Sequence, residues 1–231
     1  MDEDGLKRII IAEEKETVRL EYKRGFIWSE GDADMTEEQA RTIRAVLAFT
    51  NSRGAGTLII GVNDDTHGNL DFVGCTPEQM ASFNDLDKVQ ECINKYSSEP
   101  LSYTIKLFAV EKEDGSERQF VAIQINEFGK YPTLCIQDWP KGQRQLPKSK
   151  YKLIRDDMYV RGLKGKPSSK KATELELRRI LDMVEDKNEE RLVELFDNIT
   201  EKTVKRFLEK YSGTTKHPKA PKPYTKRDKD L

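Results

Sequence analysis

The amino-acid sequence predicts an α+β domain, in which a β-sheet packs against amphipathic helices. Apolar residues recur at helical spacing up to Thr50, and a short apolar run at residues 57–62 then has the length of a buried strand. Two more strand-like runs follow at residues 103–110 and 120–126, joined by a polar turn. Helices and strands are thus mixed before residue 165. An α/β sandwich is the alternative.

The N-terminal region predicts one helix and one strand. A short amphipathic helix is expected over residues 5–15. Residues 17–22 then alternate between apolar and polar, as in a strand with one buried face. The polar face of this strand carries Arg19, Glu21 and Lys23.

The second helix has recognisable signals at both of its ends. Thr36 and Gln39 have the spacing of a capping box, so the helix is expected to begin there. Asn51 is placed to end it. Gly54 and Gly56 follow in a turn, and both can adopt the positive φ that such a turn requires.

The rest of the chain predicts further short elements. A helix is expected over residues 85–96, and two short strands at 133–136 and 158–161. We divide the chain into a domain at 1–165, a linker at 166–171, C-terminal helices at 172–185 and 189–211, and a disordered basic tail at 212–231.

Composition excludes several classes of site. The 231 residues are 35% charged but have a formal net charge of only -1, so attraction to nucleic acid has to be local. The three cysteines are widely spaced, which indicates reduced thiols rather than disulfides or a zinc site. Two histidines argue against histidine-based catalysis. With neither a signal peptide nor a membrane-length apolar run, we expect a cytoplasmic protein.

Three carboxylates on neighbouring predicted elements suggest a site for a divalent cation. Glu16 and Glu21 belong to the first strand region, and Asp64 follows the strand at 57–62. If they meet, their oxygens suit Mg²⁺ or Mn²⁺, which would polarise a phosphodiester and activate a water molecule. Lys23 shares the face of Glu21 and is placed to contact a phosphate.

The spacing of the two glutamates sets a condition on this site. Glu16 and Glu21 are separated by an odd number of residues, so one regular strand would point them to opposite faces. Glu16 must therefore precede the strand or lie at a bulge. The structural alternative is that Arg19, Glu21 and Lys23 form an ordinary solvated strand face.

Taken together, these segments resemble the Schlafen AlbA-like domain family over about residues 10–185. The resemblance rests on Glu16-Thr17-x-x-x-Glu21-Tyr22-Lys23, Ala48-Phe49-Thr50-Asn51-Ser52-x-Gly54, Gly56-Thr57-Leu58-x-Ile60-Gly61-Val62-x-Asp64 and Met158-Tyr159-Val160-Arg161-Gly162. It implies a mixed sheet packed with helices, and nucleic-acid binding. Vertebrate members include endonucleases of transfer RNA and ribosomal RNA.

The resemblance also implies roles for single residues. The catalytic carboxylates of the Schlafen nucleases match Glu16, Glu21 and Asp64, so these three are the expected catalytic residues and metal ligands. Asn63-Asp64 replaces the common Asp-Asp, and Gly54-Ala55-Gly56 replaces the usual Gly-Gly. The zinc site and second lobe of the vertebrate cores have no counterpart in this sequence.

Basic residues provide candidate contacts to nucleic acid. They are Lys23, Lys148, Lys150, Lys152 and Arg161. The segment at 141–152 combines lysine and arginine with nearby aromatic residues, a composition that suits phosphate contact with base stacking. A solvated loop is the alternative.

Two functions therefore remain open. The first is a metal-dependent endoribonuclease acting on structured RNA such as transfer RNA, in prokaryotic stress or phage defence. The second is a non-catalytic module that binds RNA or DNA. An ATP-binding domain is a third option, although the sequence has no Walker A motif. Apolar residues in the C-terminal helices further predict a homodimer or higher assembly.

Overall fold

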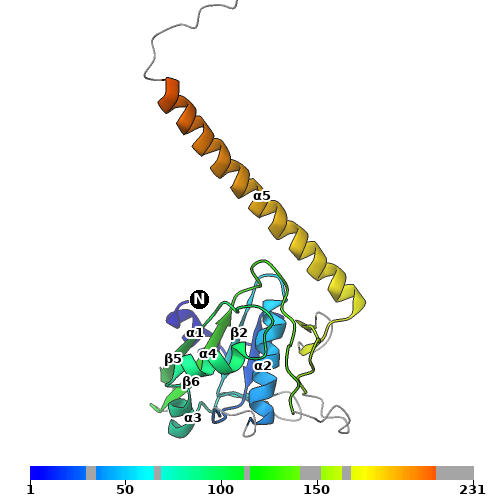
Figure 1. Cartoon of the computed structure of the whole chain (residues 1–231). Coiled ribbons are helices and arrows are strands. Elements are labelled where there is room, and N and C mark those ends of the chain that lie inside the picture. Colours follow the sequence, from blue (N-terminus) through cyan, green and yellow to red (C-terminus); the bar gives the residue numbers. More distant parts are fainter. Residues whose placement is uncertain (30–34, 65–68, 112–114, 141–151, 163–167, 212–231) are drawn as a thin grey trace, which may run out of the picture. The chain divides into compact units, whose positions relative to one another are not determined.

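The computed structural model describes residues 1–29, 35–64, 69–111, 115–140, 152–162 and 168–211 (Figure 1). Two compact units are present, Met1–Lys187 and Asn188–Leu231. The helices are α1 (Glu3–Ile11), α2 (Glu37–Thr50), α3 (Pro77–Ser82), α4 (Leu86–Asn94) and α5 (Glu174–Tyr211). The strands are β1 (Leu20–Lys23), β2 (Gly56–Ile60), β3 (Asn63–Asp64), β4 (Leu70–Asp71), β5 (Tyr103–Glu111), β6 (Glu117–Ile125), β7 (Tyr159–Arg161) and β8 (Ser169–Lys171).

A four-stranded mixed sheet forms the centre of the first unit, in the order β1-β2-β6-β5. β1 and β2 are parallel and α2 connects them, whereas β6 pairs with β2 and β5 in antiparallel fashion. Two small antiparallel pairs, β3-β4 and β7-β8, lie outside this sheet. The predicted α+β fold with a mixed sheet is confirmed.

Both faces of the sheet are covered, and the strands alternate between them. Leu58 and Ile60 of β2 join a core with α2 and α4, while Ile59 between them faces α1. β1 follows the same rule, because Leu20 and Tyr22 belong to the α1 core. Side chains at the intervening positions of β1 therefore point toward the layer that contains α2.

The beginning of α2 matches the prediction in part. The Thr36 hydroxyl accepts a hydrogen bond from the Gln39 backbone nitrogen at 3.2 Å, as a helix cap does. The fully buried Gln39 side chain does not complete a capping box. Its amide binds Ser29 instead, with Nε2 donating to the Ser29 carbonyl at 2.9 Å.

The turn after α2 corrects one sequence expectation. Gly54 has a φ of 82°, but the second residue with a positive φ is Ala55, at 64°, rather than Gly56. Gly56 is required for space, since a Cβ atom there would lie 2.0 Å from the Phe49 ring. At Gly54 a Cβ would also meet the Arg19 guanidinium at 2.4 Å.

The C-terminal elements also differ from the prediction. Instead of two helices, α5 runs without interruption over Glu174–Tyr211, because residues 186–188 contain neither Pro nor Gly to stop it. Ser169–Lys171, expected as linker, forms β8 against β7. At 133–136 only Cys135 forms an isolated bridge, with Ser97. The tail at 212–231 lies outside the described residues, and the domain boundaries stay predictions.

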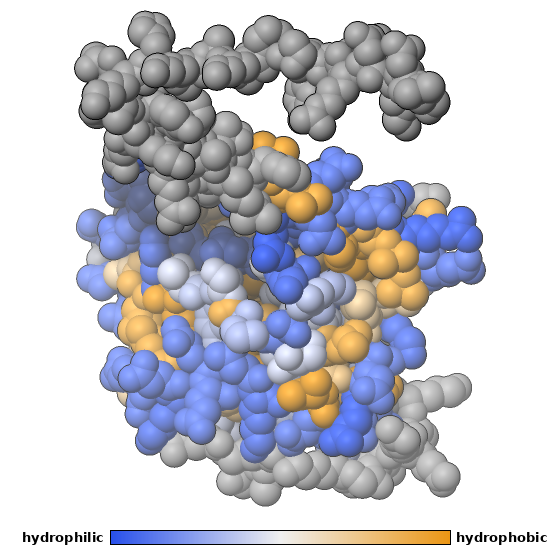
Figure 2. All heavy atoms as spheres, turned by 45° about the horizontal axis from the view of Figure 1, so that its top comes forward, coloured by the Kyte–Doolittle hydropathy of each residue, from blue (hydrophilic) through white to orange (hydrophobic). Residues whose placement is uncertain are grey.

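Apolar residues on the surface form separate groups among hydrophilic ones (Figure 2). No helix in the described ranges is both long and apolar enough to cross a lipid bilayer. The three cysteines are free thiols. Burial raises the pKa of Cys75 and of Cys135 to about 11, which makes both poor nucleophiles near neutral pH.

Candidate functional site

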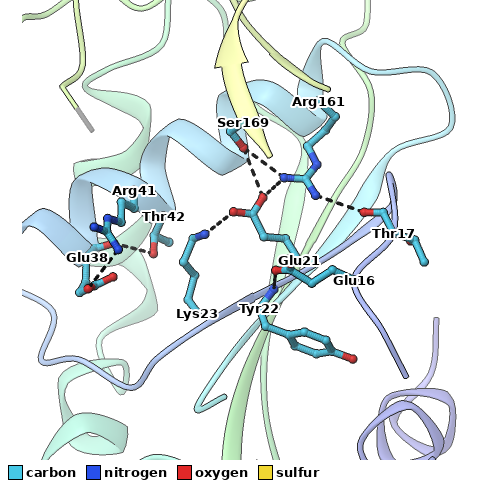
Figure 3. Close-up of polar contacts among 10 residues, drawn as sticks. All are labelled: Glu16, Thr17, Glu21, Tyr22, Lys23, Glu38, Arg41, Thr42, Arg161 and Ser169. Carbon is cyan, nitrogen blue, oxygen red and sulfur yellow. Dashed lines mark hydrogen bonds and ion pairs between the residues drawn. The ribbon is translucent and has the colours of Figure 1, made fainter. Parts of the chain in front are cut away.

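The Glu21 carboxylate lies at the centre of a buried polar cluster on β1 (Figure 3). Its two oxygens accept from different groups. Lys23 Nζ donates to Oε1, and Arg161 Nη1 from β7 donates to Oε2. The hydroxyl of Ser169 in β8 donates to the same Oε2 at 3.2 Å. The solvated-face alternative is therefore wrong for Glu21, which is only 5% exposed.

Arg161 is buried as deeply as its partner. Its Nη2 donates to the Thr17 carbonyl at 3.1 Å, and its guanidinium carbon lies 4.7 Å from the centre of the Phe49 ring. Burial lowers the pKa of Arg161, and the carboxylates of Glu21 and Glu16 offset part of that effect. The predicted contact of Arg161 with nucleic acid stays untested, but this guanidinium already serves, with Lys23, as a counter-ion of Glu21.

Glu16 lies outside the regular strand, as its odd separation from Glu21 required. It precedes β1, and the chain turns between Thr17 and Leu20, which form an isolated bridge. Glu16 Oε1 then accepts from the Tyr22 backbone nitrogen at 3.0 Å. Glu16 and Glu21 both act electrostatically on Arg161. Of the three predicted carboxylates, Glu21 is hydrogen-bonded directly to the Arg161 guanidinium, and Glu16 acts on it electrostatically.

Asp64 completes the predicted triad, and its backbone position is known. It lies in β3, opposite Leu70 of β4, and β3 contacts β1. Its side chain is outside the described part of the structure, so the convergence of all three carboxylates stays a prediction. Among the side chains that the structure describes, no group of three His, Cys, Asp or Glu residues could hold a metal ion.

The chemistry of the donor set bears on the expected metal. Carboxylate oxygens of Glu16 and Glu21, with the Thr17 carbonyl nearby, are ligands that Mg²⁺ and Mn²⁺ accept. They already face positive charge, which Arg161 and Lys23 supply. The residues are of a type that binds a hard metal ion. The charges of the two carboxylates, Glu16 and Glu21, are balanced by those of Arg161 and Lys23. An ion would therefore have to compete with the protein's own cations.

Asn51 holds the segments that carry the site. Its side chain is buried, its Nδ2 donates to the carbonyls of Thr133 and Tyr159 at 2.8 and 3.0 Å, and its Oδ1 accepts from the Thr133 nitrogen at 2.8 Å. This fixes the strand that presents Arg161 against the end of α2. The helix-ending role expected of Asn51 is confirmed. Its hydrogen bonds to Thr133 and Tyr159, which are distant in the sequence, were not predicted.

The predicted basic loop is described only at one end. Lys148 and Lys150 lie outside the described residues. Lys152 is half-buried and precedes Leu153, which bridges Trp139. Ser169 was missed because nothing in its local sequence distinguishes it. Its role depends on the pairing of β8 with β7.

Comparison with known proteins gives one strong result. No curated protein matches the chain significantly. A crystal structure of the DIP2311 protein from Corynebacterium diphtheriae is similar, with a TM-score of 0.40 and 16% identity over 73% of this chain and 29% of that chain. Likeness at this level establishes no function. The sequence profile of the family Schlafen, AlbA_2 matches residues 16–166, which is more than half of the chain and includes both Glu16 and Glu21. The chain therefore belongs to the Schlafen AlbA_2 family, a membership that suggests binding of nucleic acid.

Proposed function

We propose that this protein is a metal-dependent endoribonuclease that acts on structured RNA such as transfer RNA. The observation that carries the proposal is that Glu21 and Glu16 both act electrostatically on Arg161, with Lys23 paired to Glu21. Family membership supplies the nucleic-acid partner. Acidic groups next to a lysine are a combination that suits cleavage of a phosphodiester.

Each residue has a distinct role in this proposal. Glu16, Glu21 and Asp64 would hold Mg²⁺ or Mn²⁺, which when bound polarises the phosphodiester and lowers the pKa of an attacking water. Lys23 binds a phosphate oxygen when RNA enters, since its ammonium lies at Glu21 and its side chain is 14% exposed. Arg161 orients Glu21 through a direct hydrogen bond. Ser169 supports the same carboxylate oxygen.

The test compares cleavage of total transfer RNA with Mg²⁺, with Mn²⁺ and with EDTA. Glu21→Ala is a poor variant, because it leaves the charge of Arg161 buried without this partner. A loss of cleavage could then result from unfolding rather than from the loss of a catalytic group. Asp64→Asn and Glu16→Gln keep the size of the side chain, and Glu16→Gln also keeps the acceptor for the Tyr22 backbone nitrogen, so both should abolish cleavage without lowering the melting temperature by more than a few degrees. Glu127→Gln, at a carboxylate that pairs with Lys187 instead, is the matched control and should stay active. Cleavage that survives EDTA or Asp64→Asn contradicts the proposal.

The second candidate is a non-catalytic module that binds RNA or DNA. The observation that favours it is the charge balance at Glu21, whose oxygens already have a lysine and an arginine as partners. Such a protein should bind RNA in EDTA with an affinity that falls steeply with salt. Replacing Lys148, Lys150 and Lys152 with Ala should reduce the salt slope by about 3 if all three contact phosphates. An unchanged slope means that the loop makes no such contacts.

The protein is further proposed to assemble as a homodimer or larger. α5 carries large apolar side chains that are more than one third exposed: Leu175, Leu177, Leu181, Leu192 and Val193. Burying such residues between copies would be favourable, and two-fold dimers are the commonest assemblies. Light scattering should give about twice the 26.7 kDa chain mass at micromolar concentration. A mass of one chain, with and without RNA, contradicts this.

A further inference from the structure

A second site lies beside the Glu21 cluster, in a cavity of about 270 Å³ within the first unit. Four segments enclose it: the chain before β1, the turn after α2, strand β7, and the first turns of α5. Its apolar walls include Val18, Val160, Ile180 and Met183. Ile180 and Met183 are 3% and 6% exposed, so this wall is preformed by the core rather than assembled from mobile surface groups.

The mouth of this cavity is positively charged. Arg19, Arg53 and Arg179 contribute to its lining and are exposed. Arg53 pairs with Asp186. Within the described part of the chain, the guanidinium groups of Arg19 and Arg179 form neither a hydrogen bond nor an ion pair. Two cations at an apolar opening therefore remain available to an anionic ligand.

A buried donor provides independent support for a ligand. Arg161 also lines the cavity and is 2% exposed. Its Nε atom is buried and has no hydrogen-bond partner among the residues that the structure describes. Buried donors without a partner are rare in folded proteins, because each one costs about 1–3 kcal/mol. An acceptor atom of a ligand would satisfy this group.

We propose that the cavity binds one unpaired nucleotide of the nucleic acid. A nucleobase is flat and apolar on its faces, so it suits the apolar walls that include Val18 and Met183. The phosphate of the same nucleotide binds Arg19 and Arg179 at the mouth. Asp182, which also lines the cavity, accepts from an exocyclic amino group of the base. This inference rests on the proposed nucleic-acid function and specifies an RNA with a bulged or single-stranded residue.

The test measures binding, in EDTA, of two fluorescent RNA hairpins that differ by one bulged nucleotide. The bulged hairpin should bind about tenfold more tightly, since stacking of a base in a protein site is worth ~1–3 kcal/mol. Equal affinity for the two hairpins overturns the inference and leaves the proposed function standing. No binding of either hairpin overturns both.

Two variants and one matched control locate the effect. Val18→Trp fills the cavity from its exposed side, at a residue that is 39% exposed, and Arg179→Gln removes a cation from the mouth. Both should lose the tenfold preference while binding the unbulged hairpin within about threefold of the wild type. Arg178→Gln alters the neighbouring arginine, which pairs with Glu174 and does not line the cavity, so it should keep the preference. A preference that survives in both cavity variants contradicts the inference.

Discussion

Two groups of ion pairs touch the same part of the molecule, the turn after α2, and they differ in burial. In the inner pair, the side chains of Arg161 and Glu21 are 1% and 7% exposed. In the outer pair, those of Arg53 and Asp186 are 65% and 54% exposed. Water screens the outer charges, so that pair contributes little to stability. Each inner charge depends on its partner, because water cannot replace it.

The largest expected effect is at the inner pair. Arg161→Met should lower the free energy of unfolding by about 3–5 kcal/mol, since it leaves Glu21 buried with Lys23 as its only remaining cation among the contacts described. Urea unfolding followed by circular dichroism measures this. The double variant Glu21→Gln, Arg161→Met should recover most of the loss. A double variant no more stable than the single one would show that the cost comes from packing against Phe49 instead.

A second effect tests the hydrogen bonds that hold β7 against α2. Asn51→Ala leaves two carbonyls and one backbone nitrogen without their partner, so it should cost on the order of 3 kcal/mol. Asn126→Ala is the control, since Asn126 Nδ2 donates to Ser102 Oγ at an exposed position. Equal melting temperatures for the two variants would show that water enters the Asn51 site.

A smaller effect of opposite sign is expected in the turn itself. Ala55 has a φ of 64°, a conformation that costs an L-residue about 1–2 kcal/mol. Ala55→Gly should therefore raise the free energy of unfolding by about 1 kcal/mol. Ala81→Gly, in α3, should lower it by about the same amount. Destabilisation by both changes would contradict the assigned turn geometry.

The outer pair should tolerate substitution. Arg53→Ala is expected to change the free energy of unfolding by less than about 1 kcal/mol, and less again at 1 M salt. Thermal melts at two salt concentrations measure this. A cost comparable with that of Arg161→Met would remove the distinction between the two groups.

The smallest expected effect is a dependence of the free energy of unfolding on pH that arises from Glu127. This residue lies near the outer pair, because Arg53 acts on it electrostatically. Burial raises the pKa of Glu127, but hydrogen bonds from Gly54 N and Lys187 outweigh it, and the pKa falls below its ordinary value. The folded protein thus binds this proton less readily than the unfolded chain. Its stabilising contribution is present above about pH 4.3 and is lost as the pH falls further. Glu127→Gln should flatten the acid limb of the stability curve, and an unchanged limb would contradict this.

Local patterns were sufficient to predict the elements that carry the glutamates. The cap at Thr36, the helix to Thr50 and the strand after it follow from short-range spacing, and the odd separation of the two glutamates required Glu16 either to precede β1 or to lie at a bulge. The partner of Glu21 was beyond such reasoning, because Arg161 is 140 residues away. β8 was missed because Ser169–Lys171 lacks the apolar alternation of a strand and depends on its pairing with β7, and the unbroken α5 was missed because two helices were assigned although no helix-stopping residue separates them.

The separation between Glu21 and Arg161 also has a consequence for the timing of folding. At about 5–20 residues per second, a ribosome needs about 7–28 s to synthesise the 140 residues between them. During that interval β1 can pair with β2 and α2 can cover them through Leu58 and Ile60, but Glu21 has no guanidinium. The nascent chain can thus form its sheet while Lys23, from the same strand, is the cation available to its central carboxylate.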